Sequence, residues 1–397
     1  MTTLDAAPYA TDIDPYSWES IQDPHACDGA IRELAPVVYL TRYDVWATGR
    51  HEQVREMTHD WETYSSISRP FHDPHSVRPE ILLSDDPPRH GKVRSVVQRA
   101  LSPMVMKRMR ADFEVEAERL LDVLLANGTA ELNGHTDLAA AFVLKVFPDA
   151  IGLPDEGREH LLSFGDVVFN TFGPQNEIFF EGMAKGAEAI AWVDRNAKPD
   201  ALAPGGIGAT IYEAAESGEV TWEEAELLVK TVFAAGSDTT ILAMTNLLKI
   251  FAQQPEQWEL LRADPSRARA AFEEGLRYDA PARAGGRITT REVQVEGTLI
   301  PEGARILLLW LAAGRDVRKW QDPDRYDLRR KSSGHLGLGF GIHSCVGQAL
   351  ARIEADVLFS ALARRVERIE LVGEPVHVRN TTVHGDEVLP LRLHVAS

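Results

Sequence analysis

Hydrophobic residues form strand-like runs in only a few short stretches of this chain. Two pairs of such runs predict hairpins, residues 37–40 with 45–48 and residues 293–295 with 298–300. Most of the remaining sequence is predicted to be helical, and short Pro/Gly clusters such as 85–88 mark turns between the elements. The pattern predicts a mainly α fold with small peripheral β-sheets.

The longest predicted helix begins at Thr221. Thr221 and Glu224 have the spacing of a capping box, in which each side chain accepts a hydrogen bond from the backbone N–H of the other residue. The next proline is Pro255, which leaves roughly 33 helical residues, or about 50 Å. A helix of that length would cross the whole body of the protein.

The middle of this helix changes abruptly from small or apolar residues to polar ones. Gly236 costs about 1 kcal/mol relative to alanine within a helix, and Thr239 can divert a hydrogen bond to a carbonyl one turn back. We expect a local opening with room for a small ligand, where Asp238 relays protons and Thr239 holds a water or an oxygen ligand. The alternative is an N-cap or a surface patch on an interrupted helix.

Cys345 lies in a glycine-rich run just before a second predicted helix. Unpaired N–H groups and the helix dipole at that position favour a thiolate. Gly339, Gly341 and Gly347 allow the backbone to approach a flat, bulky group. A thiolate beside a large planar group suggests a haem iron with an axial cysteine. A structural zinc site fits poorly, because the second cysteine of the chain, Cys27, is far upstream.

Composition narrows the setting of this chemistry. The net charge of −18 argues against nucleic acid as the main partner. Two cysteines suit a reducing compartment, and the N-terminus lacks the features of a signal peptide. No uninterrupted apolar stretch looks long enough to span a bilayer. We therefore expect a cytoplasmic protein without a membrane partner.

Four motifs occur in a characteristic order, at residues 235–240, 274–277, 322–327 and 339–347. In these motifs the chain resembles the cytochrome P-450 haem-thiolate monooxygenases of the soluble bacterial type. The resemblance implies the cytochrome P-450 fold, a helical bundle with a long central distal helix and small peripheral β-sheets. It also implies a single haem domain over residues 1–397.

The resemblance assigns a structural ion network to the second and third motifs. Glu274 and Arg277 lie one helical turn apart, and Arg325 would complete a buried triad with them. We expect no catalytic role for these residues.

The implied cofactor is haem b, with Cys345 as the ligand of its iron. The other cofactor-binding candidates are basic residues expected beside the haem carboxylates and one glycine of the ligand loop: His90, Arg94, Arg287, His343 and Gly339. For each basic residue the alternative is a solvated surface charge. Leu338 stands where the family usually has phenylalanine, which weakens the expected aromatic shielding of the thiolate.

The resemblance further implies that dioxygen supplies one oxygen atom to the substrate. Electrons would come from NAD(P)H through a separate ferredoxin and ferredoxin reductase. Basic residues at 107–110 and 329–331 are candidate contacts for an acidic ferredoxin. The alternative is that the basic residues of both segments only keep the protein soluble.

Residues 167–177 look like the pocket segment of the bacterial para-methoxybenzoate O-demethylases. That resemblance implies a small aromatic substrate, most simply a methoxybenzoate that loses its methyl group as formaldehyde. The substrate-facing candidates are Val168, Phe169, Phe172, Thr231, Ala235, Arg78, Arg283 and Gly285.

The chain also departs from that subgroup. Glu80 follows Arg78 closely and would repel a carboxylate, whereas Arg283 could supply a substitute positive charge. Thr231 replaces a serine, and Gly285 replaces a phenylalanine, which should widen the pocket. The alternatives are hydroxylation of another small apolar molecule, such as an alkylphenol or a terpenoid, and a haem-based sensor without turnover. Asp238 and Thr239 argue against the sensor, which needs no proton relay.

Overall fold

The computed structural model describes residues 8–67, 71 and 81–395, and most of them are helical. The α-helices are α1 (Trp18–Gln22), α2 (Pro24–Leu34), α3 (His51–His59), α4 (Arg89–Ala100), α5 (Pro103–Leu124), α6 (Ala141–Ile151), α7 (His160–Asn170), α8 (Glu177–Lys185), α9 (Ala187–Asn196), α10 (Ile207–Glu216), α11 (Trp222–Gly236), α12 (Asp238–Gln253), α13 (Pro255–Ala263), α14 (Ala268–Tyr278), α15 (Trp310–Ala313) and α16 (Gln348–Arg365). The mainly α prediction is confirmed.

The strands are short. They are β1 (Ala10–Thr11), β2 (Val38–Leu40), β3 (Val45–Thr48), β4 (Tyr64–Ser65), β5 (Ala130–Asn133), β6 (Ala284–Thr289), β7 (Val293–Val295), β8 (Thr298–Ile300), β9 (Arg305–Leu309), β10 (Val366–Leu371), β11 (Val376–His377), β12 (Asp386–Val388) and β13 (Pro390–Val395). Both predicted hairpins are confirmed as the antiparallel pairs β2–β3 and β7–β8.

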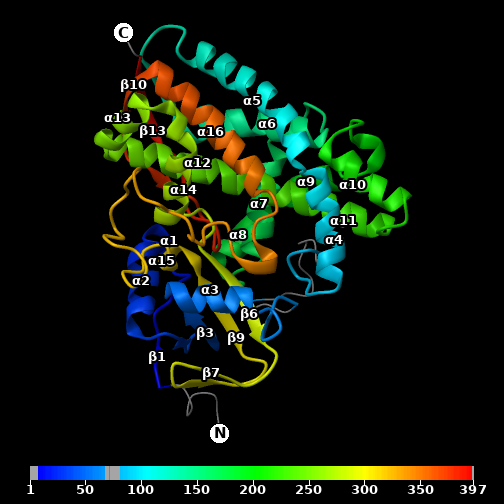
Figure 1. The fold of residues 1–397 in the computed structure, drawn as a ribbon, viewed down its shortest axis with the longest axis vertical. Helices are drawn as coiled ribbons and strands as arrows, with labels where there is room; N and C mark the ends of the chain where they lie inside the picture. The colour runs from blue at the N-terminus through cyan, green and yellow to red at the C-terminus, as the bar shows by residue number, and fades with distance from the viewer. Residues whose placement is uncertain (1–7, 68–70, 72–80, 396–397) are drawn as a thin grey trace.

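The larger sheet is more extensive than the hairpins alone predict. Its strand order is β1-β2-β3-β9-β6-β4, with β3 parallel to β9 and β6 antiparallel to it. Trp46 on β3 lies opposite Ile306 on β9, and both belong to a buried apolar cluster beside the sheet. In Figure 1 the sheet occupies the lower part of the molecule, and most of the helices lie above it.

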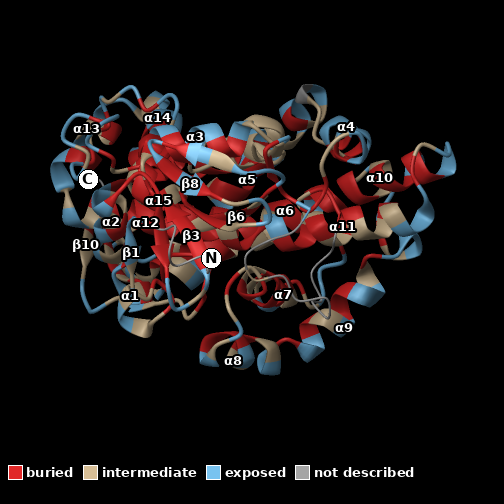
Figure 2. Ribbon diagram, turned by 90° about the horizontal axis from the view of Figure 1, so that it is seen from below, coloured by how far each residue is buried: buried red, intermediate tan, exposed pale blue. Residues whose placement is uncertain are grey.

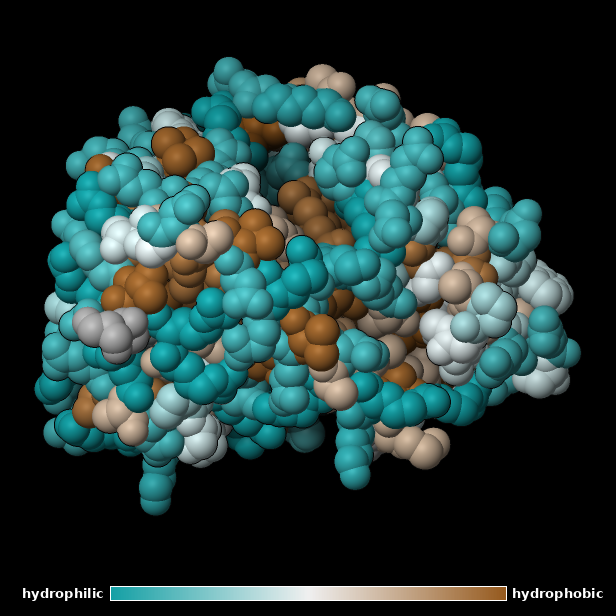
Figure 3. All heavy atoms as spheres, turned by 90° about the horizontal axis from the view of Figure 1, so that it is seen from above, coloured by the Kyte–Doolittle hydropathy of each residue, from teal (hydrophilic) through white to brown (hydrophobic). Residues whose placement is uncertain are grey.

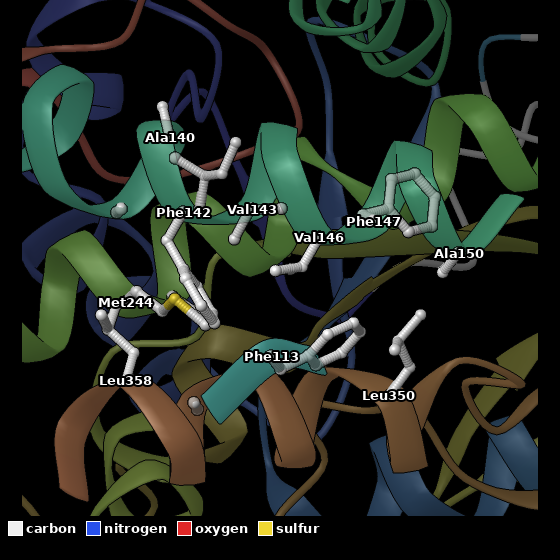
Figure 4. Close-up of a cluster of buried hydrophobic side chains, with 14 of the residues drawn as sticks. Phe113, Ala140, Phe142, Val143, Val146, Phe147, Ala150, Met244, Leu350 and Leu358 are labelled. Carbon is white, nitrogen blue, oxygen red and sulfur yellow. The ribbon is translucent and has the colours of Figure 1, made fainter. Parts of the chain in front are cut away.

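The helical part has its own apolar core. Figure 4 shows side chains of separate helices meeting there, among them Phe113 of α5, Phe142 of α6, Met244 of α12 and Leu358 of α16. These side chains are buried, and burying each one contributes about 1.5–3 kcal/mol. The core packs α12 against α14 and α16.

The long central helix is present but interrupted. The capping box at Thr221 and Glu224 forms as predicted. Ser237 has φ −101° and ψ −67°, and it separates α11 from α12 within the segment Trp222–Gln253. The two helices follow one another across the helical part of Figure 1. The local opening predicted around Gly236 therefore occurs one residue later.

The segment Trp222–Gln253 is long and apolar enough to cross a membrane, by length and composition alone. However, 72% of the apolar window is buried inside the protein, as in the core helix of a soluble protein. Figure 2 shows much of α11 and α12 coloured as buried.

The Glu274 network also differs from the prediction. The Glu274 carboxylate is fully buried and receives bidentate hydrogen bonds from Arg277 at 2.8 and 2.9 Å. The third charge is Arg330, whose Nε lies 3.0 Å from Glu274. Arg325 contributes only its backbone oxygen, which accepts from Arg277 at 3.1 Å. The side chain of Arg325 is exposed, so its assignment to the triad was wrong.

Substitution of the two arginines separates these alternatives. Arg330→Ala should lower the free energy of unfolding by about 2 kcal/mol, because the buried carboxylate loses a charged donor but keeps Arg277. Arg325→Ala should change it by less than about 0.5 kcal/mol. Urea denaturation of the haem-loaded variants measures both values. A larger loss for Arg325→Ala than for Arg330→Ala would contradict the observed network.

Candidate haem and substrate site

The Cys345 loop is shaped by glycines and by one backbone hydrogen bond. Gly339 and Gly341 adopt φ values of +68° and +67°, which side chains disfavour. The Cys345 N–H donates to the Leu338 oxygen at 2.8 Å, and α16 begins three residues after Cys345. This geometry places the thiol at the N-terminus of α16, as the sequence predicts.

The protonation of this thiol differs from the expectation. Burial raises the pKa of Cys345 above its ordinary value. The N–H groups of Gly347 and Gln348 and the charges of Arg94 and Arg352 oppose this shift without cancelling it. The helix N-terminus alone therefore does not produce a thiolate. A metal cation bound to the sulfur would, because coordination deprotonates a thiol.

Glu273 clamps both sides of this loop, which the sequence reading missed. Its carboxylate lies 2.8 Å from His335, before the loop, and also receives a hydrogen bond from Arg352, after the loop. Although burial opposes the shift, His335 and Arg352 lower the pKa of Glu273 to about 2. The feature of the sequence that points to Glu273 is its position directly before Glu274.

The four basic candidates converge beside the Cys345 loop. The rings of His90 on α4 and His343 lie 4.4 Å apart, centre to centre. Arg94, one turn along α4, donates to the Ser344 oxygen at 2.7 Å. Arg287 on β6 is 6% exposed and donates to its neighbouring backbone oxygen at 2.8 Å. Residues from three separate segments thus present positive or ionisable groups to one place.

These groups fit the carboxylates of a haem. The Nε2 atom of His90 and the Nε atom of Arg287 are buried and have no partner among the described residues. Burial, His343 and Arg94 lower the pKa of His90 to about 4, and burial lowers that of Arg287 to about 10. The carboxylate of Asp86, 3.9 Å from His343 Nε2, raises the pKa of both groups without cancelling the effect of burial. Propionate oxygens would supply both the missing acceptors and the missing charge.

Asp238 is held by close contact between two helices. A Cβ atom at Gly165 on α7 would come within 2.1 Å of the Asp238 carboxyl oxygen, so only glycine fits there. Burial, and then the neighbouring Asp166, raise the pKa of Asp238 well above its ordinary value. Burial therefore favours the protonated form of this carboxyl group. The hydroxyl of Thr239 donates to the Ala235 oxygen at 3.1 Å.

Gly236 has a packing role in addition to its expected effect on the helix. A Cβ atom there would lie 2.0 Å from the Phe147 ring of α6.

Asp166 was not predicted as a site residue. Its carboxylate accepts hydrogen bonds from Asn170 at 3.2 Å and from Asn380 at 2.7 Å.

The aromatic candidates share the face of α7 that touches Asp238. Phe169 lies one helical turn beyond Gly165, and Phe172 follows one turn later, just past the helix. Their ring centres are 6.1 Å apart, with an interplanar angle of 31°. Val168 on the same helix is buried, and Ala235 on α11 is exposed. Figure 3 shows hydrophobic side chains inside a hollow in the upper face of the molecule.

Two of the remaining substrate candidates have other partners. Thr231 is buried, and its hydroxyl donates to the Leu227 oxygen at 2.8 Å, so it is not a free donor. Arg283 donates two hydrogen bonds to Asp28, at 2.8 and 2.5 Å, and one to the Pro15 oxygen at 2.6 Å. Its expected role as a substitute charge for the substrate is therefore wrong.

The expected effect of Gly285 is also wrong. A Cβ atom at Gly285 would lie 2.4 Å from the Trp310 ring, so this indole fills the space that the missing side chain leaves. Arg78 and Glu80 lie outside the described residues.

Comparisons with known proteins agree with this geometry. A model of the cytochrome P450 family matches residues 207–375. The chain is 42% identical over 391 residues to cytochrome P450 CYP199A2 of Rhodopseudomonas palustris, covering 96% of this chain and 93% of that protein. It is 31% identical over 375 residues to vitamin D3 dihydroxylase of Streptomyces griseolus, covering 90% of each. The solved structure of CYP109Q5 from Chondromyces apiculatus superposes with a TM-score of 0.81 at 25% identity, over 98% of this chain and 99% of that one.

The basic residues beside the Cys345 loop lead to a test of how tightly the protein retains haem. Arg287→Leu should increase the rate of haem loss at least about 10-fold, because a charged hydrogen bond is worth about 1.5–3 kcal/mol. Transfer of haem to apomyoglobin, followed by absorbance, measures this rate. Arg291→Leu, an exposed arginine just beyond the same strand, should leave the rate unchanged. Equal rates for both variants would contradict the assignment of Arg287.

The burial of Asp238 leads to a test with opposite effects on stability and activity. Its raised pKa means that the folded protein keeps a proton that the unfolded chain releases as the pH rises above about 4. The parent should thus lose stability as the pH rises above about 4. Asp238→Asn should lack this loss, so that its stability advantage grows with pH, while its turnover falls at least about 10-fold.

Urea denaturation at several pH values, together with steady-state turnover, checks both effects of Asp238→Asn. A parallel pH dependence of stability in the parent and the variant would contradict the protonated state of Asp238.

Proposed function

Because this chain belongs to the cytochrome P450 family and is a haem-dependent monooxygenase, we propose that it oxidises a small aromatic compound. Oxidative O-demethylation of a methoxybenzoate-type compound is the first candidate. The observation that carries the proposal is the shared face of α7. Gly165 on that face lies against the buried Asp238, and Phe169 and Phe172 continue it with two rings tilted by 31° to each other. A flat ring packed against their exposed faces would lie one to two helical turns from Asp238.

The cofactor and the protein divide the work. Haem iron bound through Cys345 supplies the activation of dioxygen. Insertion of one oxygen atom into a methoxy C–H bond gives a hemiacetal, which breaks down to a phenol and formaldehyde. The other oxygen atom leaves as water after taking up two electrons and two protons.

The chain's own residues control protons and access in this scheme. Asp238 holds a proton beside the opening at Ser237, and the side chain of Thr239 lies directly after it. The buried Val168 and the partly buried Phe169 would help to exclude bulk water from the substrate. Protons would therefore arrive by a protein route rather than from solvent.

Bacterial proteins of this family normally receive electrons from NAD(P)H through separate redox proteins. We propose a ferredoxin and its reductase in this role. Lys107 and Arg108 are exposed on α5, which packs against α16, the helix that follows Cys345. The other predicted basic spot is less available, because Arg330 is engaged with Glu274.

A second candidate is the oxidation of a neutral small molecule, such as an alkylphenol. Arg283 favours it, since this buried guanidinium is fully neutralised by Asp28 and offers nothing to a carboxylate. The two candidates therefore differ in substrate charge and share the aromatic contacts.

A product assay distinguishes the two. With ferredoxin, ferredoxin reductase and NADH, 4-methoxybenzoate should yield formaldehyde and 4-hydroxybenzoate in equal amounts. The matched neutral compound, 4-methoxyphenol, should be converted at least about 10-fold less efficiently if a carboxylate is recognised. The reverse preference would establish the second candidate. Formaldehyde from neither compound, nor from ortho- and meta-methoxy isomers, would refute O-demethylation.

A further inference from the structure

Three possible metal ligands meet in a part of the molecule that the haem site does not use. His25 lies in α2, Asp279 directly follows α14, and His384 lies between β11 and β12. Their ligating atoms all lie within 4.8 Å of one another. The Nε2 atoms of His25 and His384 are 2.7 and 2.8 Å from the same Oδ1 atom of Asp279. Two imidazole nitrogens and one carboxylate form a ligand set typical of Zn²⁺ sites that keep a water as fourth ligand.

The contacts continue from His384 to a second carboxylate. His384 Nδ1 lies 3.1 Å from His377 Nε2, and His377 Nδ1 lies 3.3 Å from Asp386 Oδ1. Lys249 holds the other oxygen of Asp386 at 2.7 Å. Two histidines thus lie in series between two carboxylates, with side chains that are mostly buried.

This series is one proton short. Its three contacts each need one hydrogen, but two neutral imidazoles carry only two. A cation between Asp279 and His384 removes the shortage. His384 can then donate from Nδ1 to His377, and His377 can donate from Nδ1 to Asp386. Metal-binding histidines commonly donate their other ring N–H in this way, which fixes the ring and the tautomer.

We propose that His25, Asp279 and His384 bind one divalent transition-metal ion, with Zn²⁺ as the ion that suits them best. His377 and Asp386 orient the ligand His384. The site is independent of the proposed substrate and of the haem. An extra proton shared by the histidines is the competing way to complete the series, and the experiment separates the two.

The site is accessible and its ligands come from distant parts of the chain. His25 keeps 21% of its side chain exposed, which gives an ion a route of entry and gives the ring room to close on it. The backbone oxygens of Asp279 and His384 both accept hydrogen bonds from the buried Asn246 of α12, at 3.1 and 3.3 Å. An ion here would join α2, the end of α14 and the C-terminal segment beside α12.

The test uses the tag-free, haem-loaded protein and ZnCl₂ as the probe. After dialysis against chelator, calorimetric titration at pH 7.5 should show one Zn²⁺ bound per chain, and the thermal midpoint should rise with added Zn²⁺. His25→Gln should weaken binding at least 10-fold and abolish the rise in thermal midpoint. Zinc absorption-edge spectroscopy should show two imidazole ligands in the parent and one in the variant.

His160→Gln is the matched control, because His160 is also partly exposed on a helix but belongs to no such cluster. It should bind Zn²⁺ as the parent does. His384→Asn, if it folds, should lose binding as His25→Gln does. The proposal is overturned if the parent binds less than one Zn²⁺ per chain, or if His25→Gln binds as tightly as the parent.

Discussion

Buried ionisable groups of opposite character face one another around the Cys345 loop. Burial raises the pKa of the Cys345 thiol, although the nearby N–H groups and arginines oppose the shift. On the other side of the loop, burial weakens the protonation of His90 and Arg287. A haem answers both demands, since it carries a cation at its centre and carboxylates at its edge. Chain segments 250 residues apart converge there, as the hydrogen bond from Arg94 to the Ser344 oxygen shows.

The distal side depends on the same principle, applied to a single carboxyl group. Gly165 and Gly236 let α7, α6 and α11–α12 approach closely enough to exclude water around Asp238. That exclusion raises the pKa of Asp238 and so favours the form that can donate a proton. Tight packing of the helices stabilises the fold, whereas a buried acid destabilises it. The protein nevertheless keeps Asp238 buried where the proposed reaction needs protons.

Local sequence patterns predicted local structure well and long-range partners poorly. The capping box, both hairpins and the helix interruption follow from spacing within a few residues. By contrast, Arg330 rather than Arg325 completes the Glu274 network, and Trp310 occupies the space beside Gly285. These choices depend on which side chains the fold brings together, and spacing along the chain does not encode them. The same reason explains why the pairing of Arg283 with Asp28, 255 residues away, was missed.

Helix α14 connects these features. Glu273 binds residues on both flanks of the Cys345 loop, and Glu274 anchors the segment that precedes this loop. Asp279, just past the end of the helix, contacts two histidines from opposite ends of the chain. Each acid faces at least one basic side chain more than fifty residues away, so the helix sets the relative positions of separate segments. Most of this electrostatic network lies outside the chemistry itself. This network holds Cys345 at a fixed position relative to α12. A proton on Asp238 can take part in the proposed reaction only if that position is fixed.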